Sequence, residues 1–297
     1  MSLTENEMNN ILIILRCTSS LSIIGSTIMM IDIMKSGNIK KQCRMRILTG
    51  VSFFDIISSI SLFMGPWPTE EDYRGLDAYG NYYTCQAQGF FTSFLCGSAL
   101  YNLCLAIVYY LIVKHGKTEN WLRSNVEPWM HIGCICYNIG LAVAMLPFGF
   151  DAYNNSDTFG CAPSDKVHIV VNIFMYYAIL LTIGLVTILM ILLYRSVKQN
   201  ERKVRRFSTR GSMRNLSKQS RSIAYQCFAF SGSFYVVYIP FIVYFFIESS
   251  SNHDDYDQYV LGILANLFLP LQGFLNTLVY FRPRIATYIA SAKKSCC

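Results

Sequence analysis

A short basic segment carries the side chains best suited to accept phosphate groups. Residues 195–221 contain ten Lys and Arg but one acid. Within this segment, "RRFS" places Ser208 shortly after paired arginines, a pattern that basophilic kinases favour because their acidic pockets bind such cations. Each phosphate adds about −1.5 to −2 charges, so four or five would bring the segment from +9 to about neutral. The candidate phosphorylation sites are Ser208, Thr209, Ser212, Ser217 and Ser220.

Two polar side chains within long apolar runs, Asp55 and Asn276, form a second candidate site. Ionisable groups are costly at membrane depth and are found there mostly where they have a function. These two lie at comparable depth, where a carboxylate and an amide facing each other could hold a water or sodium cluster, or a proton. With Tyr280, they are our candidates for an activation switch. The alternative is an isolated, protonated Asp55 whose hydrogen bonds come from nearby serines, namely Ser52, Ser58 or Ser59.

The elements that position these residues are apolar runs of membrane-spanning length. The chain is 53% hydrophobic and 14% charged, whereas soluble domains average about 25% charged residues. A helix needs roughly 20 apolar residues to cross the hydrocarbon core. Seven runs meet this length: 11–33, 47–67, 85–113, 128–150, 167–194, 223–247 and 259–281. Because buried helices of soluble proteins alternate polar and apolar faces, the sequence predicts an all-α bundle of seven transmembrane helices over residues 1–281.

The cations are distributed unequally between the two sides of the predicted bundle. The loops after spans one, three and five, with the tail after residue 281, hold 22 Lys and Arg and 3 acids. The amino-terminal tail and the other three loops hold 2 Lys and Arg and 13 acids. Lys and Arg are retained on the cytoplasmic side. We therefore expect the amino terminus outside, the carboxyl terminus inside, and residues 195–221 in the cytoplasm, where the basic loop meets anionic membrane lipids.

Two of the eleven cysteines are placed in the outer region: Cys85 opens span three on the outer side, and Cys161 lies in the loop between spans four and five. Disulfides persist in that oxidising compartment, so we expect these two to pair and to tether the loop between spans four and five. Two free outer thiols are the alternative. In the same loop, "NNS" makes Asn154 a candidate glycosylation site.

The last segment, residues 282–297, is predicted to form a short amphipathic helix on the inner membrane surface. Pro283 suits a first helical position. Apolar residues fall on one face, with Lys293 and Lys294 near the lipid headgroups. Cys296 and Cys297 could then carry acyl chains, and a prenylated terminal Cys-Cys is the alternative.

Motifs of enzyme chemistry are absent from the sequence. There is no HExxH, no Gly-rich phosphate loop and no pair of carboxylates within the spans. A retinal-linked light sensor needs a lysine in its last span, and residues 259–281 contain none. His131 and His168 are expected at opposite membrane faces, so they do not share a metal site. We expect no catalytic residue, no metal and no cofactor.

Seven spans, an outer disulfide to the start of span three and a long basic loop after span five together resemble a G-protein-coupled receptor. The rhodopsin-like branch expects an acid-Arg-aromatic triplet at the inner end of span three, where this chain reads "AIVYYLIVKHG". Its Asn-Pro-x-x-Tyr motif is also absent. "LCLAIVYYLIVK", residues 103–114, looks instead like the slime-mould cyclic-AMP receptor family, as does "SFFDIISS" around Asp55. "LQGFLNTLVYFRPR" is similar to span seven of the wider cyclic-AMP-receptor-like and secretin-like group.

This resemblance implies a plasma-membrane receptor that passes an extracellular signal to heterotrimeric G proteins, with no cofactor and no nucleic-acid partner. Coupling would use the inner ends of spans three, five and six and the basic loop, where the candidate cations are Lys114, Arg202, Lys203, Arg205 and Arg206. A small-solute transporter or channel is the main alternative, and a structural membrane protein is the other.

The ligand is not expected to be cyclic AMP, because a phosphate would need several cations at the outer mouth. The outer half offers few of them amid 13 acids. A cationic or neutral ligand is more compatible with the negative electrostatic potential of this acidic outer side. The candidate ligand-binding side chains are Arg16, Arg74, Lys166 and His168.

Overall fold

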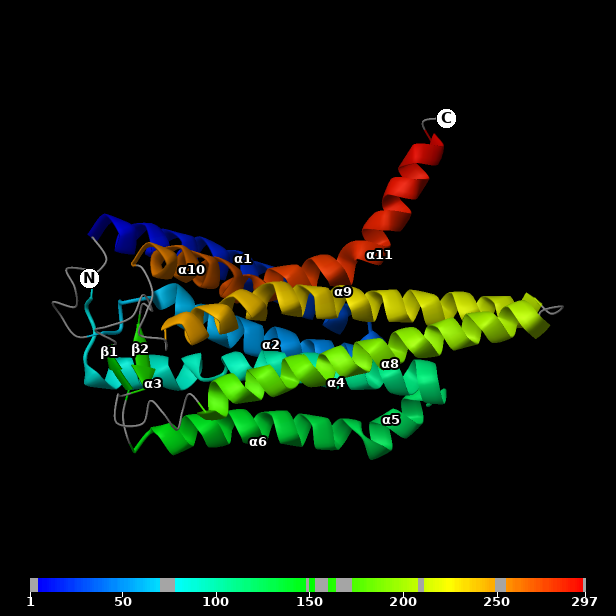
Figure 1. Ribbon diagram of the computed structural model, residues 1–297, viewed down its shortest axis with the longest axis horizontal. Helices are drawn as coiled ribbons and strands as arrows, with labels where there is room; N and C mark the ends of the chain where they lie inside the picture. The colour runs from blue at the N-terminus through cyan, green and yellow to red at the C-terminus, as the bar shows by residue number, and fades with distance from the viewer. Residues whose placement is uncertain are drawn as a thin grey trace.

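The protein is an elongated bundle of long helices that lie side by side along one axis (Figure 1). Its computed structural model describes residues 5–69, 78–147, 150–152, 160–163, 173–207, 211–248 and 255–295. Within these ranges, seven helical stretches are long and apolar enough to cross a membrane. The predicted all-α bundle of seven transmembrane helices is therefore confirmed.

The elements follow one another with few interruptions. Those of the first half are α1 (Glu5–Lys35), η1 (Asn38–Lys40), α2 (Cys43–Met64), α3 (Tyr82–Thr92), α4 (Leu95–His115), α5 (Glu119–Asn125) and α6 (Glu127–Met145). Those of the second half are β1 (Phe150–Ala152), β2 (Cys161–Pro163), η3 (Ile173–Tyr177), α8 (Ala178–Phe207), α9 (Gly211–Glu248), α10 (Asp255–Phe268), η4 (Leu269–Leu271) and α11 (Gln272–Ser295). The third and seventh spans are each built from two consecutive helices, α3 with α4 and α10 with α11.

Local sequence signals set several helix ends. Asn81 begins α3 with a capping box, because its side chain accepts from the backbone of Tyr83 and Thr84 while the Thr84 hydroxyl accepts from the Asn81 backbone N–H. Gly116 ends α4 in the left-handed conformation, with φ of 59°. Thr118 then caps α5 by accepting from the Trp121 N–H.

The two ends of the bundle differ in shape (Figure 1). We name the end that carries β1 and β2 the outer end and the opposite end the inner end, after the orientation expected from the distribution of cations. The antiparallel pair β1 and β2 lies at the same end as the start of α1, with Ala152 opposite Cys161. At the opposite end, α8 and α9 extend together well beyond the other helices. The chain between residues 195 and 221 is thus helical over most of its described length and continues the fifth and sixth spans.

The carboxyl-terminal segment is helical, but it is not a separate helix. Pro283 lies inside α11, which runs without interruption to Ser295. Proline removes one backbone hydrogen bond and favours a kink. The last turns of α11 accordingly lead away from the bundle (Figure 1).

The first and last spans approach each other through small side chains, as is common in membrane bundles. Gly273 on α11 packs so closely on α1 that a Cβ there would overlap the Oγ of Ser26. Gly25 on α1 faces the backbone of Phe274 at 3.1 Å from its would-be Cβ. This close contact places the polar residues of α1, α2 and α11 in one layer.

Candidate functional site

A buried carboxylate–amide pair lies in the middle of the bundle. The Nδ2 of Asn276 on α11 donates to Oδ2 of Asp55 on α2 at 3.1 Å. The Oγ of Ser233 on α9 donates to Oδ1 of Asn276 at 3.3 Å. Asp55 is 2% exposed and Asn276 is fully buried. The predicted pair is thus brought together, and it links three spans through one amide.

The neighbouring serines do not saturate the Asp55 carboxylate. Ser52 and Ser58 donate to backbone carbonyl groups of their own helix, and Ser59 donates to Ser22 on α1 at 3.0 Å. Ser22 in turn accepts from the backbone N–H of Gly273 at 3.1 Å. Ser59 and Ser22 therefore connect α1, α2 and α11 beside the pair, and Ser52, Ser58 and Ser59 direct their hydroxyls to groups other than the Asp55 carboxylate.

The inner end of α11 is joined to α1 by a second polar contact. Tyr280 donates its hydroxyl to Oδ2 of Asp32 at 2.6 Å, and Arg284 donates to the other carboxylate oxygen at 2.8 Å. We name these three residues the α1–α11 latch. Sequence reasoning chose Tyr280 but missed its partners. The available signal was Asp32 itself, which is the only acid besides Asp55 within the predicted spans.

Sequence analysis also did not predict a network of ion pairs and hydrogen bonds at the inner end of the bundle. Arg46 on α2 forms a forked contact with both carboxylate oxygens of Glu127 on α6, with Nη2 to Oε2 at 2.6 Å. The third nitrogen of Arg46 donates to the Ile39 carbonyl oxygen at 2.6 Å. Nδ1 of His131 lies 2.9 Å from the Tyr101 hydroxyl on α4, and its Nε2 lies 3.7 Å from Glu127. This network ties the inner ends of spans two and four together.

On the outer side, a disulfide joins Cys85 in the first turn of α3 to Cys161 in β2. Gln88, one turn further along α3, supports this connection. Its Nε2 donates to the carbonyl oxygens of Ser61 and Gly65, while its Oε1 accepts from the Cys161 N–H at 3.0 Å. The hairpin is therefore fixed to α2 as well as to α3.

We expect replacement of Cys85 by Ser to lower the free energy of unfolding by about 2–5 kcal/mol, because the crosslink closes a long loop. Surface delivery or ligand response should fall with it. Thermal unfolding in detergent and surface labelling measure the two effects. Replacement of the exposed free cysteine Cys136 by Ser is the control and should leave both unchanged. Mass spectrometry of the native protein that found both outer thiols free would contradict the disulfide.

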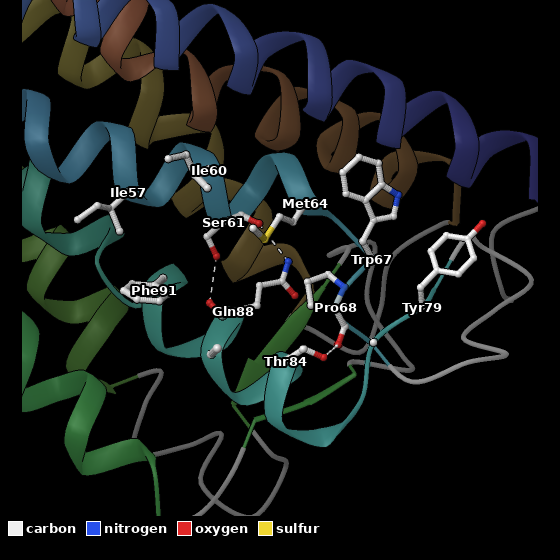
Figure 2. A pocket seen from close by; sticks show the side chains of 12 residues that line it. Ile57, Ile60, Ser61, Met64, Trp67, Pro68, Tyr79, Thr84, Gln88 and Phe91 are labelled. Atoms are coloured by element: carbon white, nitrogen blue, oxygen red, sulfur yellow. Dashed lines mark hydrogen bonds between the residues drawn. The ribbon is translucent and has the colours of Figure 1, made fainter.

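An outer pocket of about 590 Å³ lies between α2 and α3 (Figure 2). Its wall is formed mainly by apolar and aromatic side chains. Two of its polar side chains are hydrogen-bonded to the protein: Gln88 to α2, and Thr84 to the Pro68 carbonyl oxygen at 2.8 Å. Pockets of this size and character bind small molecules with mainly apolar surfaces. The other lining side chains that Figure 2 labels are Ile57, Ile60, Ser61, Met64, Trp67, Tyr79 and Phe91.

Of the predicted ligand-binding side chains, Arg16 alone is described. Its guanidinium lies over the ring of Trp67 at 4.5 Å from the centroid, and this cation–π contact places it behind the outer pocket. Its Nε and one Nη are buried without a hydrogen-bond partner among the described residues. Arg74, Lys166 and His168 lie outside the described residues, as does Asn154.

The predicted coupling residues lie at the opposite end. Lys114 is in the last turn of α4, and Arg202 is exposed on α8. Lys203, Arg205 and Arg206 belong to the last turns of α8. Of the candidate phosphorylation sites, Ser208 and Thr209 lie outside the described residues, whereas the remaining three are on α9: Ser212, Ser217 and Ser220. Cys296 and Cys297 also lie outside the described residues.

These features are assembled on a fold that is already known from solved structures. The crystal structure of squid rhodopsin matches with a TM-score of 0.70 and 14% sequence identity, over 100% of this chain and 89% of that chain. The chain belongs to the 7 transmembrane receptor (rhodopsin family), whose profile matches residues 25–280. Within the described residues, no three His, Cys, Asp or Glu side chains come together as a metal site.

Two curated relatives carry the same printed name, "Probable G-protein coupled receptor 21". The human protein is 27% identical over 239 residues, which are 76% of this chain and 64% of the relative. The mouse protein is 26% identical over 248 residues, which are 79% of this chain and 66% of the relative. The chain thus matches slightly less than two thirds of each relative's length.

The expected relationship to the slime-mould cyclic-AMP receptor family and the secretin-like group is not supported by these matches. That interpretation was based partly on the absence of two motifs of the rhodopsin-like branch, the acid-Arg-aromatic triplet and Asn-Pro-x-x-Tyr. At the inner end of span three, the stretch "AIVYYLIVKHG" contains no acid or arginine. In span seven, Asn276 and Tyr280 have the spacing of the Asn-Pro-x-x-Tyr motif, with Thr277 at the proline position. The chain therefore retains the two polar groups of that motif, and both make contacts to other spans.

Proposed function

We propose that the protein is a plasma-membrane receptor that transmits an extracellular ligand signal to heterotrimeric G proteins. The observation that carries this proposal is the match of residues 25–280 to a receptor family. In this proposal the amino terminus faces outward, because 22 of the 25 Lys and Arg fall on the other side. The ligand reaches the outer end, and the G protein meets the inner ends of spans three, five and six.

The extended ends of α8 and α9 support the coupling role. Any change in spacing between the fifth and sixth spans moves these ends, because each is continuous with its span. Their cations complement an acidic groove on a partner. The outer pocket, with its apolar wall, supports a neutral and largely apolar ligand, and Arg16 is engaged by Trp67 rather than presented at its surface.

The experiment that tests the proposal is nucleotide exchange on purified G proteins by the reconstituted protein. We expect exchange to be faster than without the receptor, and slower again when Lys114 and Arg202 are replaced by Gln. Replacement of Arg123 by Gln, on α5, is the matched control. Solute flux through liposomes without any effect on exchange would favour the transporter or channel instead.

Phosphorylation of the basic loop is the proposed off-switch, with a basophilic kinase as partner. We expect signalling of a variant with Ala at residues 208, 209, 212, 217 and 220 to decay more slowly after sustained stimulation, because the loop keeps its net charge of +9. Nucleotide exchange followed over time in stimulated cells measures the decay. Decay as fast as in the parent protein would contradict the switch, and the basic loop would then only set the membrane orientation.

A further inference from the structure

A second pocket, of about 390 Å³, lies between α9 and α11 near the inner ends of the sixth and seventh spans. We name it the inner pocket. Its α9 side carries Arg221, Ser222 and Gln226, and its α11 side carries Arg282. Arg221 stands two residues before the apolar run 223–247, so its guanidinium lies near the depth of the lipid headgroups in the predicted orientation. Further into the membrane, Ala229 and Val279 provide an apolar wall.

The two arginines of the inner pocket are available for a ligand. Arg284, two residues beyond Arg282, already forms an ion pair, because its Nη1 donates to Oδ1 of Asp32 at 2.8 Å. Arg221 and Arg282 have no ion pair or hydrogen bond to any side chain in the described part of the chain, and both are exposed. The Arg282 guanidinium lies over the Tyr225 ring at 4.0 Å. This stacking orients the guanidinium and leaves its N–H edge free to donate.

The chemistry of the inner pocket is that of a phosphate site with an apolar extension. Two guanidinium groups bind phosphate oxygens with charge-assisted hydrogen bonds, and the Ser222 hydroxyl and Gln226 amide add neutral donors. A soluble phosphate would leave the apolar wall unused. An acyl chain would cover it, and the anionic lipids of the inner leaflet attract cations at this depth.

The geometry points to a binding site for one anionic phospholipid of the inner leaflet, its phosphate held by Arg221 and Arg282 and an acyl chain lying against Ala229 and Val279. The bound lipid connects the inner ends of the sixth and seventh spans. It therefore favours the packing in which these ends are adjacent. The proposed lipid site depends on the assignment of the basic loop to the inner side of the membrane. It does not depend on G-protein coupling.

The test is lipid binding to the purified full chain, measured by native mass spectrometry with phosphatidylglycerol and with phosphatidylcholine of the same acyl chains. We expect one phosphatidylglycerol to bind at least about tenfold more tightly than phosphatidylcholine. The paired change Arg221→Gln and Arg282→Gln should weaken phosphatidylglycerol binding about tenfold or more, because it removes the charge-assisted hydrogen bonds to the phosphate. Unchanged thermal unfolding shows that the variant is folded.

The matched control is Arg195→Gln with Lys198→Gln. These two exposed cations lie on the inner part of α8, and Lys198 also lies near a ring, that of Tyr194. This control removes the same number of charges but should change phosphatidylglycerol binding by less than about twofold, since exposed charges outside the site contribute little. Equal losses in both variants, or equal affinity for the two lipids, would overturn the site. Displacement of the lipid by equimolar glycerol phosphate would also overturn it, because it would identify a soluble phosphate as the ligand.

Discussion

Replacing Glu127 by Gln is expected to lower the free energy of unfolding by about 3 kcal/mol. The change keeps the shape of the side chain but removes the negative charge that faces Arg46, whose side chain is 19% exposed. Breaking a buried ion pair from one side costs about 3–5 kcal/mol, because the remaining charge stays unpaired. Because the guanidinium is partly exposed, we expect a loss at the lower end of this range. Thermal or denaturant unfolding in detergent measures the loss.

Two further variants separate the ion pair from a general effect of the substitution. Glu201→Gln makes the same chemical change on α8 at a half-buried position and should alter stability by at most about 0.5 kcal/mol. The paired change Arg46→Met with Glu127→Leu should cost less than Glu127→Gln alone, since no lone charge remains. A Glu127→Gln protein as stable as its parent would show that the forked contact does not stabilise the bundle.

The second large effect is expected from Asp55→Asn. An amide oxygen at residue 55 still accepts from Asn276, but the hydrogen bond loses its charge, and charged hydrogen bonds exceed neutral ones by about 1–2 kcal/mol. The packing described here, in which Asn276 also accepts from Ser233, is weakened by that amount. We expect ligand-independent nucleotide exchange to change about fivefold or more, with folding nearly intact.

The controls for this switch use the same layer of the bundle. Among the described residues, the buried hydroxyl of Ser52 is bonded to the Leu48 carbonyl oxygen alone. In Ser52→Ala, nucleotide exchange should therefore stay within about twofold of the parent value. The double variant Asp55→Asn with Asn276→Asp swaps the two side chains and restores a carboxylate–amide pair. Nucleotide exchange should therefore return towards the parent value. If Asp55→Asn leaves both exchange and ligand affinity unchanged, the pair has a structural role only.

The overall architecture could be predicted because it depends on quantities that are local in the sequence. The length of each apolar run requires a span whatever the other spans do. The depth of Asp55 and Asn276 follows from counting residues along their own helices. The pairing of Cys85 with Cys161 needed only the side of the membrane on which each lies.

The contacts that were missed depend on how each helix is rotated about its axis. Asp32 contacts Tyr280 only because close packing at Gly25 and Gly273 fixes the faces of α1 and α11, and neither rotation is visible in one sequence. The contact between Arg46 and Glu127 was not predicted for the same reason. In the sequence, both residues were counted only among the charges of the cytoplasmic loops. The receptor branch was assigned wrongly because absent motif residues were weighed more heavily than the retained Asn276 and Tyr280.

The α1–α11 latch has a consequence for the time course of biosynthesis. Asp32 is separated from Tyr280 by 248 residues and from Arg284 by 252. At about 5–20 residues per second, a ribosome needs roughly 12–50 s after making Asp32 before its partners exist. During that interval the carboxylates of Asp32 and Asp55 both lack the α11 side chains that bind them. A chain that stops before α11 would keep two unpaired carboxylates at membrane depth, and this distinguishes an incomplete molecule from a finished one.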